Sequence, residues 1–268
     1  MARLEALRLP RRRVRAPRGW QRLRWAILGV ATVVVTVVAS LPATWMADRI
    51  ATDSQRRVLL ADAAGTLWHG SATLALSAGT GSQTATVLPG RLRWDVAFWP
   101  LLTGTLRVVL EQDASMAAPV TVAVTPAGWT VQSGSIRLPA SLLEGIGAPF
   151  NTLRPDGTMR IDWSGLQGKF AGNQKFGHLT MQLEQMSAAV SRLRPLGSYR
   201  AQVDLIGADG KLRLSTTAGP LHLEGSGTLG RQARFDGTAY ADPEAATQLA
   251  GLLSLLGRTE NNVTRLRF

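Results

Sequence analysis

The stretch DGTMRIDW, residues 156–163, alternates apolar with polar side chains, and GHLTMQLEQ, residues 177–185, repeats that alternation a short distance later. In the first stretch the apolar side chains share one face of the extended chain, and they belong to Met159, Ile161 and Trp163. An alternation with a period of two is typical of a β-strand that buries one face. The segment 168–177, GKFAGNQKFG, is rich in glycine and predicts a hairpin loop. We therefore predict two antiparallel strands joined by this loop.

The same alternation recurs along most of the chain after residue 58. It is found at 91–96, 105–111, 199–205, 211–215, 220–225 and 234–240. Short alternating segments spaced about ten residues apart, with turn residues between them, favour an antiparallel all-β layer. The sequence therefore predicts a mainly β protein in which residues 58–268 form an antiparallel β-sheet domain, either curved or sandwich-like.

Two of the predicted strand pairs resemble each other. PGRLRWD at 89–95, followed by GTLRVVLEQ at 104–112, parallels DGTMRIDW followed by GHLTMQLEQ. Two interpretations are open: chance similarity between amphipathic hairpins, or a duplicated β unit that would make the sheet modular.

One amphipathic helix is predicted near the C-terminus, at about residues 243–256. Asp242 is placed as N-cap, Pro243 as the first helical residue and Glu244 in the first turn. Leucines then recur at helical spacing, and glycine ends the element; these residues are Leu249, Leu252, Leu253, Leu256 and Gly257. A shorter helical turn is predicted at 139–145.

The N-terminal region predicts a membrane anchor. Residues 1–24 hold nine arginines and one glutamate, a net charge of +8, and residues 25–47 carry no charge. A helix of about 20 apolar residues crosses a bilayer, and positive charge beside it stays in the cytoplasm. We therefore expect a basic cytoplasmic tail (1–24), a transmembrane helix (25–47), a charged juxtamembrane stalk (48–57) and an exported domain (58–268).

Two other export signals compete for this segment. A cleaved signal peptide has a shorter apolar core that ends at small residues, which the LPA at 41–43 imitates. The PRRRVRA at 10–16 resembles a twin-arginine signal but lacks the apolar residues that usually follow the pair. The length of the apolar run favours the uncleaved anchor.

Composition excludes several classes of function. The formal charge is +12, but residues 48–268 account for only +4 of it, so the basic tail is better explained by topology than by nucleic-acid binding. The chain has no cysteine, which excludes disulfides, thiolate metal sites and cysteine nucleophiles.

No motif predicts a catalytic, metal or cofactor site. GSGTLG at 225–230 matches the dinucleotide pattern G-x-G-x-x-G, but a strand and not a helix is predicted after it, so we interpret its glycines as turn residues. His69, His178 and His222 are far apart in sequence, without a second ligand at metal-binding spacing. We expect them to be surface or interface residues.

Five of the eight tryptophans lie in the predicted exported domain, and they are Trp68, Trp94, Trp99, Trp129 and Trp163. Buried tryptophans pack a core and usually find a partner for the indole N–H. The alternative is an apolar groove or docking surface lined by some of them.

In several short motifs, the chain resembles the type II secretion system protein N family. The GTLWHG at 65–70 is similar to the family signature just after the anchor, and the residues that carry it are Gly65, Thr66, Leu67, Trp68 and Gly70. His69 stands where a small residue is expected. Further motifs follow in order: LRW at 92–94, WPLL at 99–102, LPA at 138–140, PLGSY at 195–199 and LLG at 255–257.

The resemblance implies a non-enzymatic accessory or scaffold component of the type II secretion system. Such a protein is anchored in the inner membrane of a Gram-negative cell by one span, with its C-terminal domain in the periplasm. It supports export of folded proteins across the outer membrane, and its partners are other secretion components and membrane lipid. The alternative is an anchored envelope protein that handles or transfers lipid on an apolar sheet face.

Overall fold

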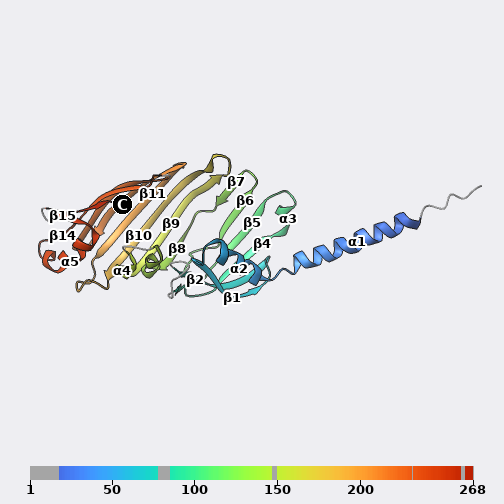
Figure 1. Cartoon of the computed structure of the whole chain (residues 1–268), viewed down its shortest axis with the longest axis horizontal. Coiled ribbons are helices and arrows are strands. Elements are labelled where there is room, and N and C mark those ends of the chain that lie inside the picture. Colours follow the sequence, from blue (N-terminus) through green and yellow to red (C-terminus); the bar gives the residue numbers. More distant parts are fainter. Residues whose placement is uncertain (1–17, 78–84, 147–149, 231, 261–262, 268) are drawn as a thin grey trace, which may run out of the picture. The chain divides into compact units, whose positions relative to one another are not determined.

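The computed structural model describes residues 18–77, 85–146, 150–230, 232–260 and 263–267 (Figure 1). The chain forms two units, Met1–Leu41 and Pro42–Phe268. Most of the predicted basic tail lies outside the described residues. The boundary between the units falls earlier than the predicted start of the β domain at residue 58.

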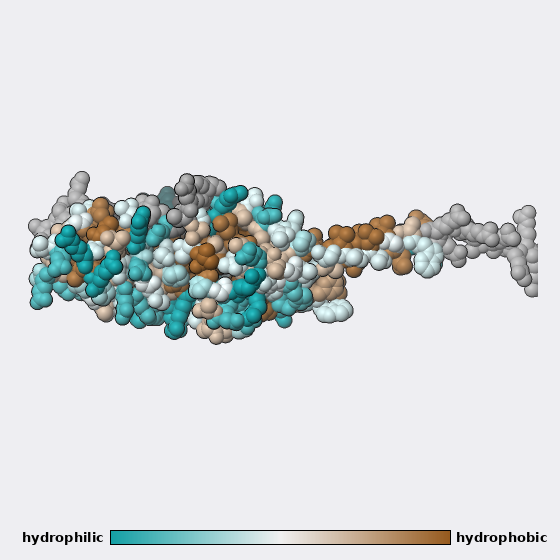
Figure 2. All heavy atoms as spheres, turned by 90° about the horizontal axis from the view of Figure 1, so that it is seen from below, coloured by the Kyte–Doolittle hydropathy of each residue, from teal (hydrophilic) through white to brown (hydrophobic). Residues whose placement is uncertain are grey.

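The first unit contains helix α1 (Arg18–Ala39). Its large apolar side chains are exposed from Trp25 to Val38, and Figure 2 shows this helix as a largely hydrophobic surface. The hydroxyls of Thr32 and Thr36 each donate a hydrogen bond to the carbonyl four residues earlier, at 2.8 and 2.9 Å. Within the described part of the chain, no helix is both long and apolar enough to cross a membrane.

The predicted single helix at 25–47 was wrong in its extent. Helix α1 ends at Ala39, and a second helix, α2 (Ala43–Asp53), begins after Pro42. Proline has no backbone N–H to donate to a preceding turn, and Pro42 is extended with φ −72° and ψ 147°. Residues 40–42 therefore separate the two helices.

Helix α2 belongs to the second unit and packs against its sheet. Ala43 and Ala47 are buried, and Ala43 lies in a cluster with Ala72, Trp94 and Val96. The predicted stalk at 48–57 is thus the end of a packed helix followed by a turn into the first strand.

The second unit is built on one antiparallel sheet. The described residues contribute 16 strands in the order β1-β2-β4-β5-β6-β7-β9-β10-β11-β12-β13-β14-β16-β15, with β3 paired to β2 and β8 to β9. The strands are β1 (Val58–Gly65), β2 (His69–Ser77), β3 (Ala85–Val87), β4 (Leu92–Ala97), β5 (Leu106–Glu111), β6 (Val120–Thr125), β7 (Gly128–Val131), β8 (Gly134–Pro139), β9 (Pro155–Lys169), β10 (Gln174–Ala188), β11 (Gly197–Gly207), β12 (Asp209–Ala218), β13 (Leu221–Leu229), β14 (Arg234–Ala241), β15 (Arg258–Glu260) and β16 (Val263–Arg267). The prediction of a mainly β, antiparallel domain is confirmed, and its strands form one open sheet.

The hairpin predicted from residues 156–185 forms, with a shorter loop than expected. Met159 pairs with Leu183 and Ile161 with Met181, so the apolar faces of β9 and β10 coincide. The two strands continue to Lys169 and from Gln174, which leaves a turn of 170–173 in place of the predicted loop. The similar pair at 89–112 also forms neighbouring antiparallel strands, β4 and β5.

Short helices cover the apolar face of the sheet. The 3-10 helix η1 (Ala140–Ile146) buries Leu142 and Leu143 against Met159 of β9 and Tyr199 of β11. Leucines of β2, Leu74 and Leu76, pack against the same cluster. The sheet is therefore curved, because β2 and β11 are far apart in the strand order (Figure 1). The remaining short helical elements are α3 (Phe98–Leu101), α4 (Phe150–Leu153) and η2 (Ala171–Asn173).

The predicted C-terminal helix is α5 (Ala246–Leu256), and it buries Leu249, Leu252 and Leu253 as expected. Its start was predicted three residues too early. Asp242 is not the N-cap, because its carboxylate interacts with Nε2 of His222 at 2.9 Å, and Ala245 N–H donates to the carbonyl of Asp242 in a turn. Gly257 follows the last helical residue, as predicted.

Candidate functional site

The GTLWHG sequence at 65–70 forms the tight turn between β1 and β2. Thr66 N–H donates to the carbonyl of His69 at 2.9 Å, and His69 N–H donates to Oγ1 of Thr66 at 3.2 Å. Gly65 has φ +91°, and a Cβ there would lie 2.5 Å from the carbonyl oxygen of His69. Glycine at 65 is therefore required by both backbone conformation and space.

The last residue of this sequence, Gly70, makes room for Trp94. The two residues are directly opposite on β2 and β4, and a Cβ on Gly70 would lie 2.3 Å from Cζ2 of the indole. Trp94 is buried, and its Nε1–H donates to the carbonyl of Leu67 at 3.1 Å. Val96 N–H also donates to the carbonyl of Trp68 at 2.7 Å. The turn is thus fixed to the neighbouring strand by side-chain and backbone contacts.

Trp129 and Trp163 repeat this arrangement elsewhere in the sheet. Trp129 is paired with Gly168, and Trp163 is paired with Gly134. A Cβ on Gly168 would lie 2.4 Å from the indole of Trp129, and a Cβ on Gly134 would lie 2.8 Å from the indole of Trp163. Trp163 Nε1–H donates to a backbone carbonyl at 2.8 Å. Each of these half-buried tryptophans therefore covers its own cross-strand glycine.

Trp99 differs from the other predicted aromatics because its side chain is 78% exposed. It lies in α3 next to Phe98, which is also exposed, and the two rings meet edge to face with centroids 6.1 Å apart. Phe98 in turn meets Trp68 at 5.9 Å, and Leu102 beside α3 is exposed. We call Trp68, Phe98, Trp99 and Leu102 the aromatic end. Through Trp68, the aromatic end connects the β1–β2 turn at 65–70 with an exposed apolar surface.

The outer edge of β1 is a second candidate surface. In the described strand order β1 pairs with β2 and ends the sheet, and β15 ends it on the other side. The register of β1 shifts between Ala61 and Ala64, and Asp62 has φ +50°. Arg91 Nη2 donates to the carbonyl of Asp62 at 2.7 Å. Bulges of this kind restrict edge pairing to the regular part of β1, Val58–Ala61. At its start, the N–H and the carbonyl of Val58 already bond to Oγ of Ser54, each at 3.2 Å.

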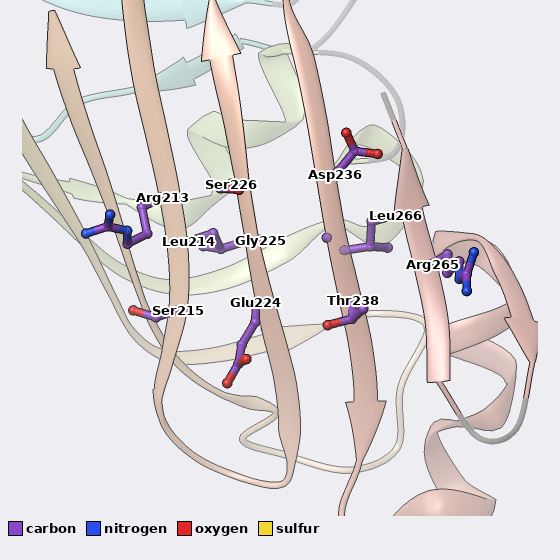
Figure 3. A pocket seen from close by; sticks show the side chains of 11 residues that line it. Arg213, Leu214, Ser215, Glu224, Gly225, Ser226, Asp236, Thr238, Arg265 and Leu266 are labelled. Atoms are coloured by element: carbon purple, nitrogen blue, oxygen red, sulfur yellow. The ribbon is translucent and has the colours of Figure 1, made fainter.

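A shallow hollow of about 660 Å³ lies over β12, β13, β14 and β16. Figure 3 shows Arg213 and Arg265 at its two ends, with Glu224 and Asp236 between them. The GSGTLG sequence runs through it, but Gly225 and Gly227 lie within β13, so the interpretation of all its glycines as turn residues was wrong. A Cβ on Gly225 would lie 2.5 Å from Cζ of Phe235, so this glycine accommodates a ring and not a phosphate.

Each predicted surface histidine lies beside an aspartate. His69 and Asp95 approach to 2.6 Å across β2 and β4, and His178 and Asp204 to 2.6 Å across β10 and β11. His222 contacts Asp242 and stacks on Tyr240 at 4.7 Å. The sequence did not reveal these pairs, because strand register brings the partners together. Among the described residues, no three potential ligands gather to hold a metal ion.

Comparison with known families identifies the family to which the sheet unit belongs. The family model for "Type II secretion system (T2SS), protein N" matches residues 56–267. The chain belongs to this family. No match was found among curated proteins or among solved structures.

The match to the T2SS protein N family includes all 16 described strands and begins after both α1 and α2. The family consists of secretion-system components and is not known to be enzymatic. Membership implies a role in type II secretion and interaction with other components of that system. The resemblance predicted from GTLWHG and the later motifs is confirmed.

Proposed function

We propose that this T2SS protein N family member is an accessory scaffold of the secretion system in the inner membrane. Its sheet unit lies in the periplasm, contacts other secretion components and supports export of folded proteins across the outer membrane. The observation that carries this proposal is the family match over the whole sheet. A scaffold needs shaped surfaces and no reacting groups, and the sheet offers an edge strand and an exposed aromatic end.

Anchoring by the N-terminal unit is part of this proposal. Its supports are the +8 charge before residue 25, the uncharged run after it and the exposed apolar side chains of α1. Thr32 and Thr36 satisfy their hydroxyls within the helix, as polar groups in a lipid phase require. The N-terminus is placed in the cytoplasm and the sheet unit in the periplasm.

Contact with a partner is assigned to the free edge of β1. An extended segment of a partner can add to an exposed strand edge through main-chain hydrogen bonds. The other edge strand, β15, has three residues, whereas β1 has eight, of which Val58–Ala61 precede the bulge. The regular part of β1 is therefore one residue longer than β15.

Site-specific photo-crosslinking in cells tests the scaffold role. A photoreactive residue at Ala61, which is exposed on β1, is expected to capture a component of the type II secretion system. The same residue at Ile206, which is 59% exposed on the interior strand β11, is the matched control. Equal capture at both positions would contradict docking at the β1 edge. Capture of lipid alone at Ala61 would also contradict it and would favour a lipid-handling role.

A further inference from the structure

The start of the second unit is held close to the end of α1 by chain length alone. Residues 40–42 connect Ala39, the last residue of α1, with Ala43, the first of α2. An extended chain spans at most about 3.6 Å per residue. The two helix ends are therefore no more than about 15 Å apart.

The aromatic end lies at this same start of the unit. Pro42 forms an antiparallel bridge with Thr66 in the β1–β2 turn. Two residues later Trp68 packs against the cluster that contains Ala43, and its ring meets Phe98. The point at which the chain enters the sheet unit and the exposed aromatic rings thus belong to one continuous packed region.

Several large apolar side chains are exposed together in this region. Trp45 is 56% exposed, Phe98 54%, Trp99 78% and Leu102 69%. The other exposed large apolar residues of the described sheet unit are spread over several strands, two connecting segments and helix α5: Val87, Leu106, Phe170, Val190, Ile206, Leu255 and Val263. Tryptophan rings favour the layer between hydrocarbon and water, because they combine a large apolar area with a polar N–H.

The apolar part of α1 is shorter than the thickness of a bilayer's hydrocarbon core, which favours contact between these rings and the bilayer. Its uncharged part, residues 25–39, rises about 22 Å at 1.5 Å per residue, whereas a hydrocarbon core is about 30 Å thick. A short apolar segment is accommodated by thinning the bilayer or by drawing flanking residues into the interface. The flanking residues here include Leu41 and Trp45.

We propose that the aromatic end and Trp45 form a membrane-contact surface that rests in the headgroup layer of the bilayer holding α1. The surface orients the sheet unit against that bilayer and makes up for the short apolar part of the anchor. This inference rests on the membrane anchoring proposed above. Its occupant is the lipid surface itself, recognised through exposed indole and phenyl rings.

Because the chain has no cysteine, a single introduced cysteine can be labelled specifically, and the membrane depth of that position can be measured in the full chain. Single variants Trp99→Cys and Leu102→Cys are spin-labelled and reconstituted in vesicles of phosphatidylethanolamine and phosphatidylglycerol. Power-saturation spectroscopy then compares the accessibility of each label to oxygen and to a water-soluble nickel chelate. Val33→Cys reports on α1, and Leu255→Cys, on a side chain 55% exposed in α5, is the water-exposed control.

The proposal predicts nickel accessibility at positions 99 and 102 several-fold below that at 255, together with raised oxygen accessibility. Equal accessibility at 99, 102 and 255, with position 33 protected, would overturn the contact surface and leave the anchor standing. Nickel accessibility at position 33 as well would overturn the anchor, and the inference with it.

A second variant separates burial by lipid from burial by protein. Trp99→Asp, combined with the label at position 102, places a charge in the proposed contact. Because Trp99 is exposed, the thermal midpoint is expected to stay unchanged, while nickel accessibility at 102 rises several-fold. Unchanged protection at 102 would mean that protein and not lipid shields the label, and would overturn the proposal.

Discussion

At the scale of single residues, the sheet is organised by tryptophans that lie on glycines. Trp94, Trp129 and Trp163 each face a glycine on the neighbouring strand, and each glycine lacks space for a Cβ. A glycine in a strand interior normally weakens the strand, because it packs no side chain. Here the indole fills that space, so the cost is offset by burial of a large ring.

Gly70→Ala is expected to lower the free energy of unfolding by about 1–3 kcal/mol, because the added methyl overlaps the ring of Trp94. The matched control is Gly251→Ala in α5, where nothing lies within 4 Å of the new Cβ. There the substitution should be neutral or stabilising by up to about 1 kcal/mol. Urea titration followed by fluorescence measures both, and equal effects would contradict the packing described.

Tyr199 is buried under η1, and its hydroxyl has no hydrogen-bond partner among the described residues. Tyr199→Phe should therefore cost less than about 1 kcal/mol at neutral pH, because no hydrogen bond to another described residue is lost. A loss of several kcal/mol would show that the hydroxyl is hydrogen-bonded after all.

Burial also raises the pKa of Tyr199 above its ordinary range. Below pH about 10 the tyrosine is protonated in both states, so it adds no pH dependence. Above that pH the unfolded state ionises while the folded state keeps its proton, so the free energy of unfolding falls. The fall should be smaller in Tyr199→Phe, as measured by urea titration between pH 8 and pH 11; parallel curves would contradict burial of the hydroxyl.

At the scale of elements, α5 closes one end of the apolar face. Leu252 is 4% exposed and lies in one buried cluster with Leu249 and Leu253, whereas Leu255 on the same helix faces outward. Leu252→Asp should lower the free energy of unfolding by about 3 kcal/mol or more, because a carboxylate would be buried without a partner. Leu255→Asp should change it by less than about 0.5 kcal/mol. Similar thermal midpoints for the two variants would mean that α5 is not docked.

Elements with a strong period were predictable from the sequence, and their boundaries depended on tertiary contacts. The alternation at 156–163 identified β9, since apolar and polar faces differ along its length. The start of α5 was misplaced because His222 occupies the carboxylate of Asp242. The exposed position of Trp99 and the histidine–aspartate pairs were also missed, because they follow from strand register and local turns. Hydrophobicity alone did not mark the helix break at Pro42.

At the scale of the whole molecule, we expect one topology in the cell. A reporter enzyme that is active only in the periplasm, fused after residue 60, should be active, and a cytoplasmic reporter at the same position should be inactive. The reason is the positive charge of residues 1–24, which retains the N-terminus in the cytoplasm. Cytoplasmic activity of the fusion, or a mature N-terminus beyond residue 43, would contradict this orientation.

A clean chromosomal deletion tests whether this T2SS protein N family member supports secretion. Folded type II substrates should then accumulate in the periplasm, with secretion restored by the intact chain and the outer-membrane barrier to large hydrophobic antibiotics unchanged. Normal secretion combined with a weakened barrier, and lipid that co-purifies with the sheet unit, would contradict the claim and assign the protein to lipid handling.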